Sequence, residues 1–135
     1  MTRKIRITSP KVAEAEDGLW SNCLKVDDTV YFSGLTSRAN DGKTIQGADE
    51  YEQAKIIFQK MKDLIEAAGG KMDDIVTLTI YTTRMSGNRD IWKARREFFT
   101  GDFPACALVE VKGLANPEIF VEIQGEARLA LAQEA

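Results

Sequence analysis

The sequence predicts an α+β domain in which one sheet carries two helices on a single face, with the element order β-β-β-α-β-α-β-β. Three observations predict this fold class. Residues 49–68 carry apolar side chains at helical spacing, residues 89–99 repeat that spacing, and the other apolar stretches are short and rich in β-branched residues. Few strands and two helices favour a two-layer design. No linker or repeat interrupts the 135 residues, so 1–135 are expected to form one domain.

The first half of the chain is expected to supply three strands and the longer helix. RKIRIT predicts a short strand, and LWSNCLKV and TVYFSGL flank an Asp-Asp pair that favours a β-hairpin. The following segment, TSRANDGKTIQGAD, is rich in turn formers and predicts a loop. In the helix, Asp49 with Glu52 resembles a capping box, and Gly69-Gly70 supplies the stop. The inward stripe is Ala54, Ile57, Phe58, Met61, Leu64, Ile65 and Ala68.

The second half adds three strands and the shorter helix. DDIVTLTIYTT is β-branched and predicts a strand, and a helix over residues 89–99 follows until Gly101 and Pro104 end it. The last two strands are CALVEVK and EIFVEIQGEARLAL. The inward positions are expected to be Val76, Leu78 and Ile80 in the strand and Ile91, Ala94 and Phe98 in the helix.

Alternation in the last two strands predicts the faces that they present. The smooth aliphatic sets are expected under the helices: Ala107, Val109 and Val111, and Ile119, Val121 and Ile123. The opposite sets mix apolar groups with carboxylates: Cys106, Leu108 and Glu110, and Phe120, Glu122, Gln124 and Glu126. A monomer would leave Leu108 and Phe120 in water beside Glu122. A symmetric oligomer would bury this mixed face, so a homo-oligomer is predicted.

Composition excludes several classes of function. The net charge of −3 and the scattered basic residues argue against nucleic-acid binding. No apolar run predicts a signal peptide or membrane span, so a cytoplasmic protein is expected. The absence of histidine excludes a histidine base, a histidine-dependent triad and a histidine-ligated zinc site. No glycine-rich nucleotide loop is present, and neither a metal nor a cofactor is expected. The two distant cysteines are expected to be free thiols.

Four strings in order resemble one known family. They are VYFSGL, GADEYEQAKIIFQKMKDLIEAAGGKMDDIVTLTIYTT, FPACALVEVKGL and VEIQGEA, and the resemblance runs from about Leu19 to Ala127. The chain resembles the reactive-intermediate deaminase family, also called the RidA or YjgF-like family. The resemblance implies a chorismate-mutase-like α+β fold and a homotrimer with a small-molecule pocket at each subunit interface. It also implies hydrolysis of enamines and imines, such as 2-aminoacrylate, to 2-keto acids and ammonia.

The resemblance assigns roles to individual residues. Glu122 matches the glutamate that positions the attacking water, and Ser33 and Gly34 match a Ser-Gly pair that helps to hold the ligand. Trp20 stands where an aromatic side chain, usually tyrosine, lines the pocket. These four residues are expected to form part of the ligand site, with Glu122 as its catalytic group.

Two positions depart from the family pattern. Cys106 replaces the arginine that follows F-P-A and forms a forked pair with the substrate carboxylate, and Trp92 stands where asparagine is common. Leu108, on the same strand face as Cys106, is expected to line the pocket with them. A charge-assisted hydrogen bond contributes on the order of 1.5–3 kcal/mol, so losing the arginine predicts an altered ligand. The resemblance also offers one altered substrate class, because some relatives deaminate aminomuconate-type intermediates of aromatic degradation.

Several alternatives remain open on the sequence. Arg84, Arg95 or Arg96 either supplies the missing anchor from another direction or is a solvated charge. Cys106 is a small strand residue, a thiol lining the ligand site, or a nucleophile, and the sequence offers no clear cation to lower its pKa. Glu122 could be a solvated carboxylate, Trp20 and Trp92 packing residues, and Ser33 a turn hydroxyl. Three functions follow: an imine deaminase with altered substrate, a non-catalytic metabolite-binding or chaperone-like protein, and a redox sensor acting through Cys106.

Overall fold

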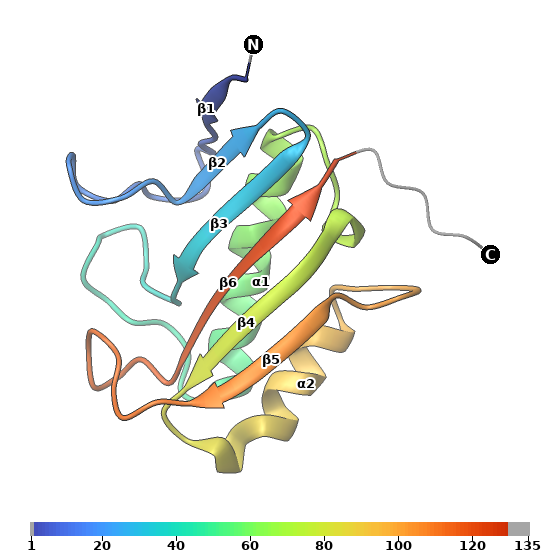
Figure 1. The fold of residues 1–135 in the computed structure, drawn as a ribbon. Coiled ribbons are helices and arrows are strands. Elements are labelled where there is room, and N and C mark those ends of the chain that lie inside the picture. Colours follow the sequence, from blue (N-terminus) through green and yellow to red (C-terminus); the bar gives the residue numbers. More distant parts are fainter. Residues whose placement is uncertain (1, 130–135) are drawn as a thin grey trace.

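A computed structural model describes residues 2–129 as one sheet with two helices (Figure 1). The elements follow the predicted order, with short 3₁₀ turns at Met72–Asp74 and Met85–Gly87. The helices are α1 (Glu50–Ala67) and α2 (Asn88–Arg96), and the strands are β1 (Lys4–Arg6), β2 (Cys23–Val26), β3 (Thr29–Leu35), β4 (Ile75–Thr82), β5 (Ala105–Glu110) and β6 (Val121–Arg128). The predicted last strand reached residue 131, and its final positions lie outside the described residues.

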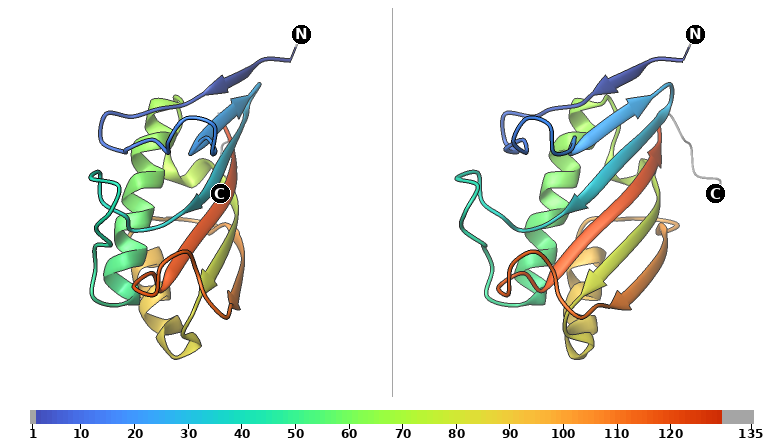
Figure 2. Two further views of the ribbon diagram at one scale, coloured as in Figure 1. Left: turned by 90° about the vertical axis from the view of Figure 1, so that its left-hand side faces the viewer. Right: turned by 60° about the vertical axis from the view of Figure 1, so that its left-hand side comes forward.

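The six strands form one mixed sheet in the order β1-β2-β3-β6-β4-β5. The β4–β5 pair is parallel because α2 connects these strands, and the other pairs are antiparallel. Both helices lie on the same side of the sheet, and no helix or strand of residues 2–129 covers the other side (Figure 2). The α+β prediction with both helices on one face is therefore confirmed.

The two ends of α1 explain why the helix occupies these residues. Asp49 caps the N-terminus, because its carboxylate accepts a hydrogen bond from the Glu52 backbone N–H at 2.9 Å. The Glu52 side chain turns further back than a capping box requires and accepts from the Ala48 N–H at 2.6 Å. At the other end Gly69 adopts a φ of 93°, which an L side chain rarely adopts.

The core lies between α1, α2 and the helix-facing side of the sheet. The predicted stripe of α1 is buried, as are Leu78, Ile80, Ile91 and Ala94. Phe98 lies beyond the end of α2 and packs on Phe58 with ring centroids 5.6 Å apart. Val76 was expected inward, but it is 39% exposed because the β4–β6 pairing shifts register between Ile75 and Thr77.

The predicted sidedness is right for β6 and wrong for β5. Val121 and Ile123 are fully buried under the helices, so Glu122 points to the open face. In β5, however, Cys106 pairs with buried Leu78, and Leu108 pairs with buried Ile80. Cys106 and Leu108 therefore lie on the helix side, and Ala107 and Val109 lie on the open face. Alternation gives two sets of residues in β5, but both sets contain apolar side chains, so the pattern does not tell which set faces the core.

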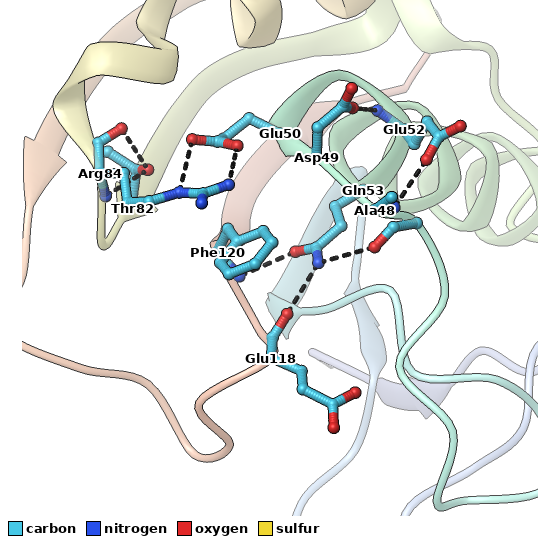
Figure 3. A network of polar contacts seen from close by, with 10 residues as sticks. Ala48, Asp49, Glu50, Glu52, Gln53, Thr82, Arg84, Glu118 and Phe120 are labelled. Carbon is cyan, nitrogen blue, oxygen red and sulfur yellow. Dashed lines mark hydrogen bonds and ion pairs between the residues drawn. The ribbon is translucent and has the colours of Figure 1, made fainter.

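A buried glutamine on α1 holds two loops together (Figure 3). Gln53 donates from Nε2 to the carbonyls of Gly47 and Glu118, and its Oε1 accepts from the Phe120 N–H at 2.8 Å. The strand predicted from Glu118 therefore starts only at Val121, because Gln53 takes the backbone bonds that a neighbouring strand would make. Gln53 thus fixes the segment that leads into Glu122.

Replacing Gln53 with leucine should lower the free energy of unfolding by on the order of 3 kcal/mol, because it leaves several buried backbone groups without partners. Chemical denaturation checks this as a lower midpoint at unchanged slope. Gln59→Leu is the matched control, since Gln59 is exposed on the same helix and its side chain donates a hydrogen bond to Asp63 one turn on. Equal midpoints for the two variants would show that the Gln53 bonds contribute nothing.

Candidate functional site

A hollow of about 410 Å³ opens where β3 ends and β6 begins. This volume falls in the range of small-molecule sites. We call it the Glu122 hollow, and its lining residues are Trp20, Ser33, Gly34, Thr36, Arg38, Ala115, Ile119 and Glu122. It brings together four of the residues that the sequence predicts for the site: Trp20, Ser33, Gly34 and Glu122.

A β-bulge in β3 makes room for the Glu122 carboxylate. The β3–β6 pairing shifts register between Phe32 and Leu35, so Ser33 and Gly34 leave the regular ladder. A Cβ atom on Gly34 would lie only 2.3 Å from Oε2 of Glu122. The carboxylate therefore sits against the Gly34 backbone, and a glycine is needed there for space rather than for an unusual φ.

The Ser33 side chain has a structural role in this chain. Its hydroxyl donates to the Ser21 carbonyl, and its backbone N–H donates to the Asn22 carbonyl at 2.9 Å. These bonds join the bulge to the segment before β2. The geometry thus favours the turn-hydroxyl interpretation of Ser33 over a nucleophile, since the proton of the hydroxyl is already donated to a carbonyl.

Half-burial of Glu122 raises the pKa of its carboxyl above the ordinary value for glutamate. The cause is desolvation, which penalises the charged form. A raised pKa makes the carboxylate a stronger base and brings it closer to the neutral pH at which a general base works best. Glu122 therefore has the electrostatic character that its expected role requires.

Trp20 forms an exposed wall of the hollow and is held by polar contacts. Its indole Nε1 donates to Asn22 Oδ1 at 3.1 Å, and its carbonyl accepts from the Arg6 guanidinium at 3.0 Å. Asn22 in turn donates to the Ala13 carbonyl at 2.9 Å. Trp20 is 53% exposed, so much of its surface is left for a ligand or another subunit. Asn22 was not singled out from the sequence, because its role depends on these long-range contacts.

The other three predicted residues lie elsewhere in the same chain. Cys106 and Leu108 lie on β5 and Trp92 lies on α2, and none of them lines the Glu122 hollow. We call these three residues the β5 group. Arg95, one turn after Trp92, donates from Nη1 to the Cys106 sulfur at 3.2 Å. No cation near Cys106 was predicted from the sequence, and this is corrected here: the crossover from β4 to β5 places α2, with Arg95, next to the strand.

The Arg95 contact does not activate the Cys106 thiol. Burial raises the pKa of Cys106 and outweighs the opposing effect of the Arg95 guanidinium. Burial also raises the pKa of Cys23 to about 12, and Cys23 is fully enclosed. Both thiols are therefore protonated at neutral pH, which weakens the nucleophile and sensor interpretations.

Alkylation of Cys106 by iodoacetamide at neutral pH should be no faster than alkylation of free cysteine, because the raised pKa leaves little thiolate. Mass spectrometry of the time course checks this rate, and Cys106→Ala assigns the modified site. Labelling of Cys106 several-fold faster than the free thiol would restore the sensor hypothesis.

Sequence reasoning missed four residues that line the Glu122 hollow: Thr36, Arg38, Ala115 and Ile119. Thr36 and Arg38 come from the segment predicted to be a loop, whereas Ile119 was placed in the predicted last strand, on the face toward the helices. No local pattern shows that these residues meet. The sequence named Arg84 as a substitute anchor, but Arg84 forms an ion pair with buried Glu50 and stacks 3.7 Å above the Phe120 ring (Figure 3). Arg84 is thus already engaged in the structure.

Comparisons with known proteins decide the family. A family model described as Endoribonuclease L-PSP matches residues 11–129. The chain belongs to this family, the RidA/YjgF family. The 2-iminobutanoate/2-iminopropanoate deaminase of Dermatophagoides farinae is 36% identical over 121 residues, covering 87% of this chain and 92% of the relative.

Solved structures of this family have the same fold. A protein of unknown function from Pseudomonas aeruginosa is 38% identical with a TM-score of 0.85, covering 97% of this chain and 96% of that one. RidA from the Antarctic bacterium Psychrobacter sp. PAMC 21119 is 28% identical with a TM-score of 0.83, covering 93% and 99%. The family prediction and the fold prediction are both confirmed.

Within residues 2–129 no cluster of three or more His, Cys, Asp or Glu side chains has the arrangement of a metal site. No helix in that part of the chain has the length and apolar character needed to span a membrane.

Proposed function

We propose that this protein is a deaminase-type hydrolase of enamines or imines, acting in the Glu122 hollow. The observation that carries the proposal is the half-buried Glu122 carboxylate, which lies against Gly34 in a hollow of metabolite size and has a raised pKa. The name of the Dermatophagoides farinae relative, a 2-iminobutanoate/2-iminopropanoate deaminase, supports the same reaction class.

The reaction needs one water and one base. Glu122 takes a proton from water as the water oxygen bonds to the imine carbon. The imine nitrogen accepts protons and leaves as ammonia when the carbon–nitrogen bond breaks. The oxygen remains on the carbon as a carbonyl group, so one imine and one water give one ketone or keto acid and one ammonia. Glu122 ends in its starting charge state.

A homotrimer explains why the predicted site residues separate into two groups within one chain. In the proposed assembly the β5 group of one subunit meets the Glu122 hollow of its neighbour and completes the pocket. Two features support such an interface: β5 is an edge strand of the sheet, and on the sheet face opposite the helices Tyr31 and Val109 are 42% and 39% exposed. Sedimentation analysis should give three chain masses, and a monomer would contradict the shared pocket.

The substrate is proposed to differ from 2-aminoacrylate. Cys106 stands in place of the arginine and is only a weak hydrogen-bond donor, so this strand cannot bind a carboxylate through a forked charged pair. A bulkier imine, such as an aminomuconate-type catabolic intermediate, fits an aromatic pocket with Trp20 and Trp92. We propose a cytoplasmic location. We also propose that the protein has no nucleic-acid partner, because its net charge is −3 and its basic residues are scattered.

The same substitution favours a second candidate function. A trimer that lacks the arginine could hold a small apolar or carbonyl metabolite without converting it, or serve in a chaperone-like role. A ligand bound in the Glu122 hollow without turnover would favour this alternative.

The test is ammonia release from freshly generated imines with and without a carboxylate, measured with and without the wild-type protein. The proposal predicts faster release for at least one member of the panel. No acceleration on any imine would contradict it and leave the binding alternative. Adding Cys106→Arg shows whether a guanidinium on β5 raises turnover of 2-aminoacrylate.

A further inference from the structure

We propose that Arg38 is the anion-binding residue of the Glu122 hollow and selects substrates that carry a carboxylate. This inference rests on the proposed function, because it names the group that orients the imine toward Glu122. It assigns the anchoring role to a loop residue that the sequence analysis did not consider, rather than to Arg84, Arg95 or Arg96.

Arg38 shares one hollow with Glu122. Among the hollow's lining residues in the described part of the chain, Arg38 is the only cation and Glu122 the only anion. The two residues therefore line the same hollow, Arg38 from a loop and Glu122 from a strand. A ligand with a carboxylate at one end and an electrophilic carbon nearby would satisfy both residues at once.

The Arg38 guanidinium has capacity for a ligand. It carries five N–H donors, and the structure gives it a side-chain bond from Nη1 to the Gly42 carbonyl at 3.3 Å, which is long for a hydrogen bond. The nearby Asp41 carboxylate already accepts from the backbone N–H groups of Lys43 and Thr44 and from the Thr44 hydroxyl. These hydrogen bonds stabilise the turn at residues 41–44. The Asp41 carboxylate does not form a forked ion pair with the Arg38 guanidinium.

The backbone beneath Arg38 is fixed. Lys60 on α1 donates from Nζ to the carbonyls of Arg38 and Thr36 at 2.6 and 2.7 Å. Arg38 also forms an isolated bridge with Ile45 across the loop. A guanidinium on a fixed backbone can form two parallel hydrogen bonds to a carboxylate and loses little conformational entropy when the ligand binds.

Two competing arginines make other contacts within the chain. Arg84 is paired with Glu50, and Arg95 lies over the helix side of β5 against Cys106. Glu122 points to the open face of the same sheet, so Arg95 could meet a Glu122 only in a neighbouring subunit. Arg38 reaches the hollow within its own chain.

The experiment compares two matched substrates: 2-iminobutanoate, and butan-2-imine, in which a methyl group replaces the carboxylate. Arg38→Gln should lower kcat/KM for 2-iminobutanoate by about 10²-fold, mainly through KM, because a forked charged pair is lost. Turnover of butan-2-imine should be unchanged, and Arg38→Lys should recover part of the loss. Arg3→Gln, at an exposed N-terminal position, is the matched control.

Three outcomes would overturn the assignment: no loss in Arg38→Gln, an equal loss on both imines, or a selective loss in Arg95→Gln instead. If wild type hydrolyses neither of these two imines, the wider imine panel decides the proposed function and binding decides the role of Arg38. Calorimetry with 2-oxobutanoate should then show binding to wild type and Glu122→Gln but not to Arg38→Gln. Equal binding by wild type and Arg38→Gln, or no binding by wild type, would overturn it. Arg38→Met provides the same comparison if Arg38→Gln does not fold.

Discussion

Glu122→Gln should lower kcat for imine hydrolysis by about 10²- to 10⁴-fold, the contribution typical of a positioned general base. Glutamine has nearly the same shape, so the packing against Gly34 stays, but its amide cannot take a proton from water. Steady-state ammonia release at saturating imine checks the effect. A higher KM with an unchanged kcat would show that Glu122 binds substrate and does not act as the base.

The matched control is Glu66→Gln, on the exposed side of α1. It removes the same charge and should retain wild-type activity. A comparable loss in both variants would point to net charge or folding as the cause and contradict the role of Glu122.

The pH dependence follows from the same carboxyl group. A base works only when deprotonated, so kcat/KM should fall as the pH drops through the pKa of Glu122. Because burial raises this pKa, the fall should begin at a higher pH than for an ordinary glutamate, whose pKa is 4.5. An acid limb at or below that ordinary value, measured in the wild type, would contradict the environment that the structure gives Glu122.

Gly34→Ala should lower kcat by about 10²-fold while leaving the fold intact, because small displacements of a catalytic group have effects of this size. The added Cβ would meet the Glu122 side chain at Oε2 and Cδ, 2.3 and 3.0 Å away. These atoms are the end of a flexible side chain, so the carboxylate can move aside without disturbing the backbone. Gly34 does not have a positive φ, so alanine suits its conformation.

Paired measurements of activity and thermal unfolding check this prediction. Gly113→Ala is the control, since a Cβ there meets nothing within 4 Å, and it should change neither quantity. Unchanged activity in Gly34→Ala would contradict the close packing of Glu122 on the bulge. A large drop in melting temperature would show that Gly34 supports the fold and not the position of Glu122.

Sequence patterns were sufficient where one face of an element is clearly apolar. The α1 stripe and the β6 alternation each have a single solution, because the opposite positions carry polar side chains. The position of Glu122 on the open face followed from Val121 and Ile123 alone. The four residues Trp20, Ser33, Gly34 and Glu122 meet in one hollow, as the family resemblance implied.

Patterns failed where long-range contacts decide the structure. The sidedness of β5 depends on its parallel pairing with β4, and the start of β6 depends on a glutamine 65 residues earlier than Glu118. The place of Arg38 depends on how two loops fold back toward β6, which local composition does not encode. The separation of Cys106 from Glu122 likewise could not be predicted, because their strands are consecutive in sequence although β4 lies between them in the sheet.

The most direct test of the central claim is the fate of a short-lived imine when a nucleophilic trap competes with the protein for it. An oxidase generates the imine, and the trapped adduct and the free ammonia and keto acid are measured as protein concentration rises. If the Glu122 hollow is a hydrolytic site, wild-type protein should lower the yield of trapped adduct and release ammonia and keto acid in equal amounts. Glu122→Gln should leave the adduct yield unchanged. The claim would be contradicted if the adduct yield did not change as wild-type protein is added, for imines with and without a carboxylate.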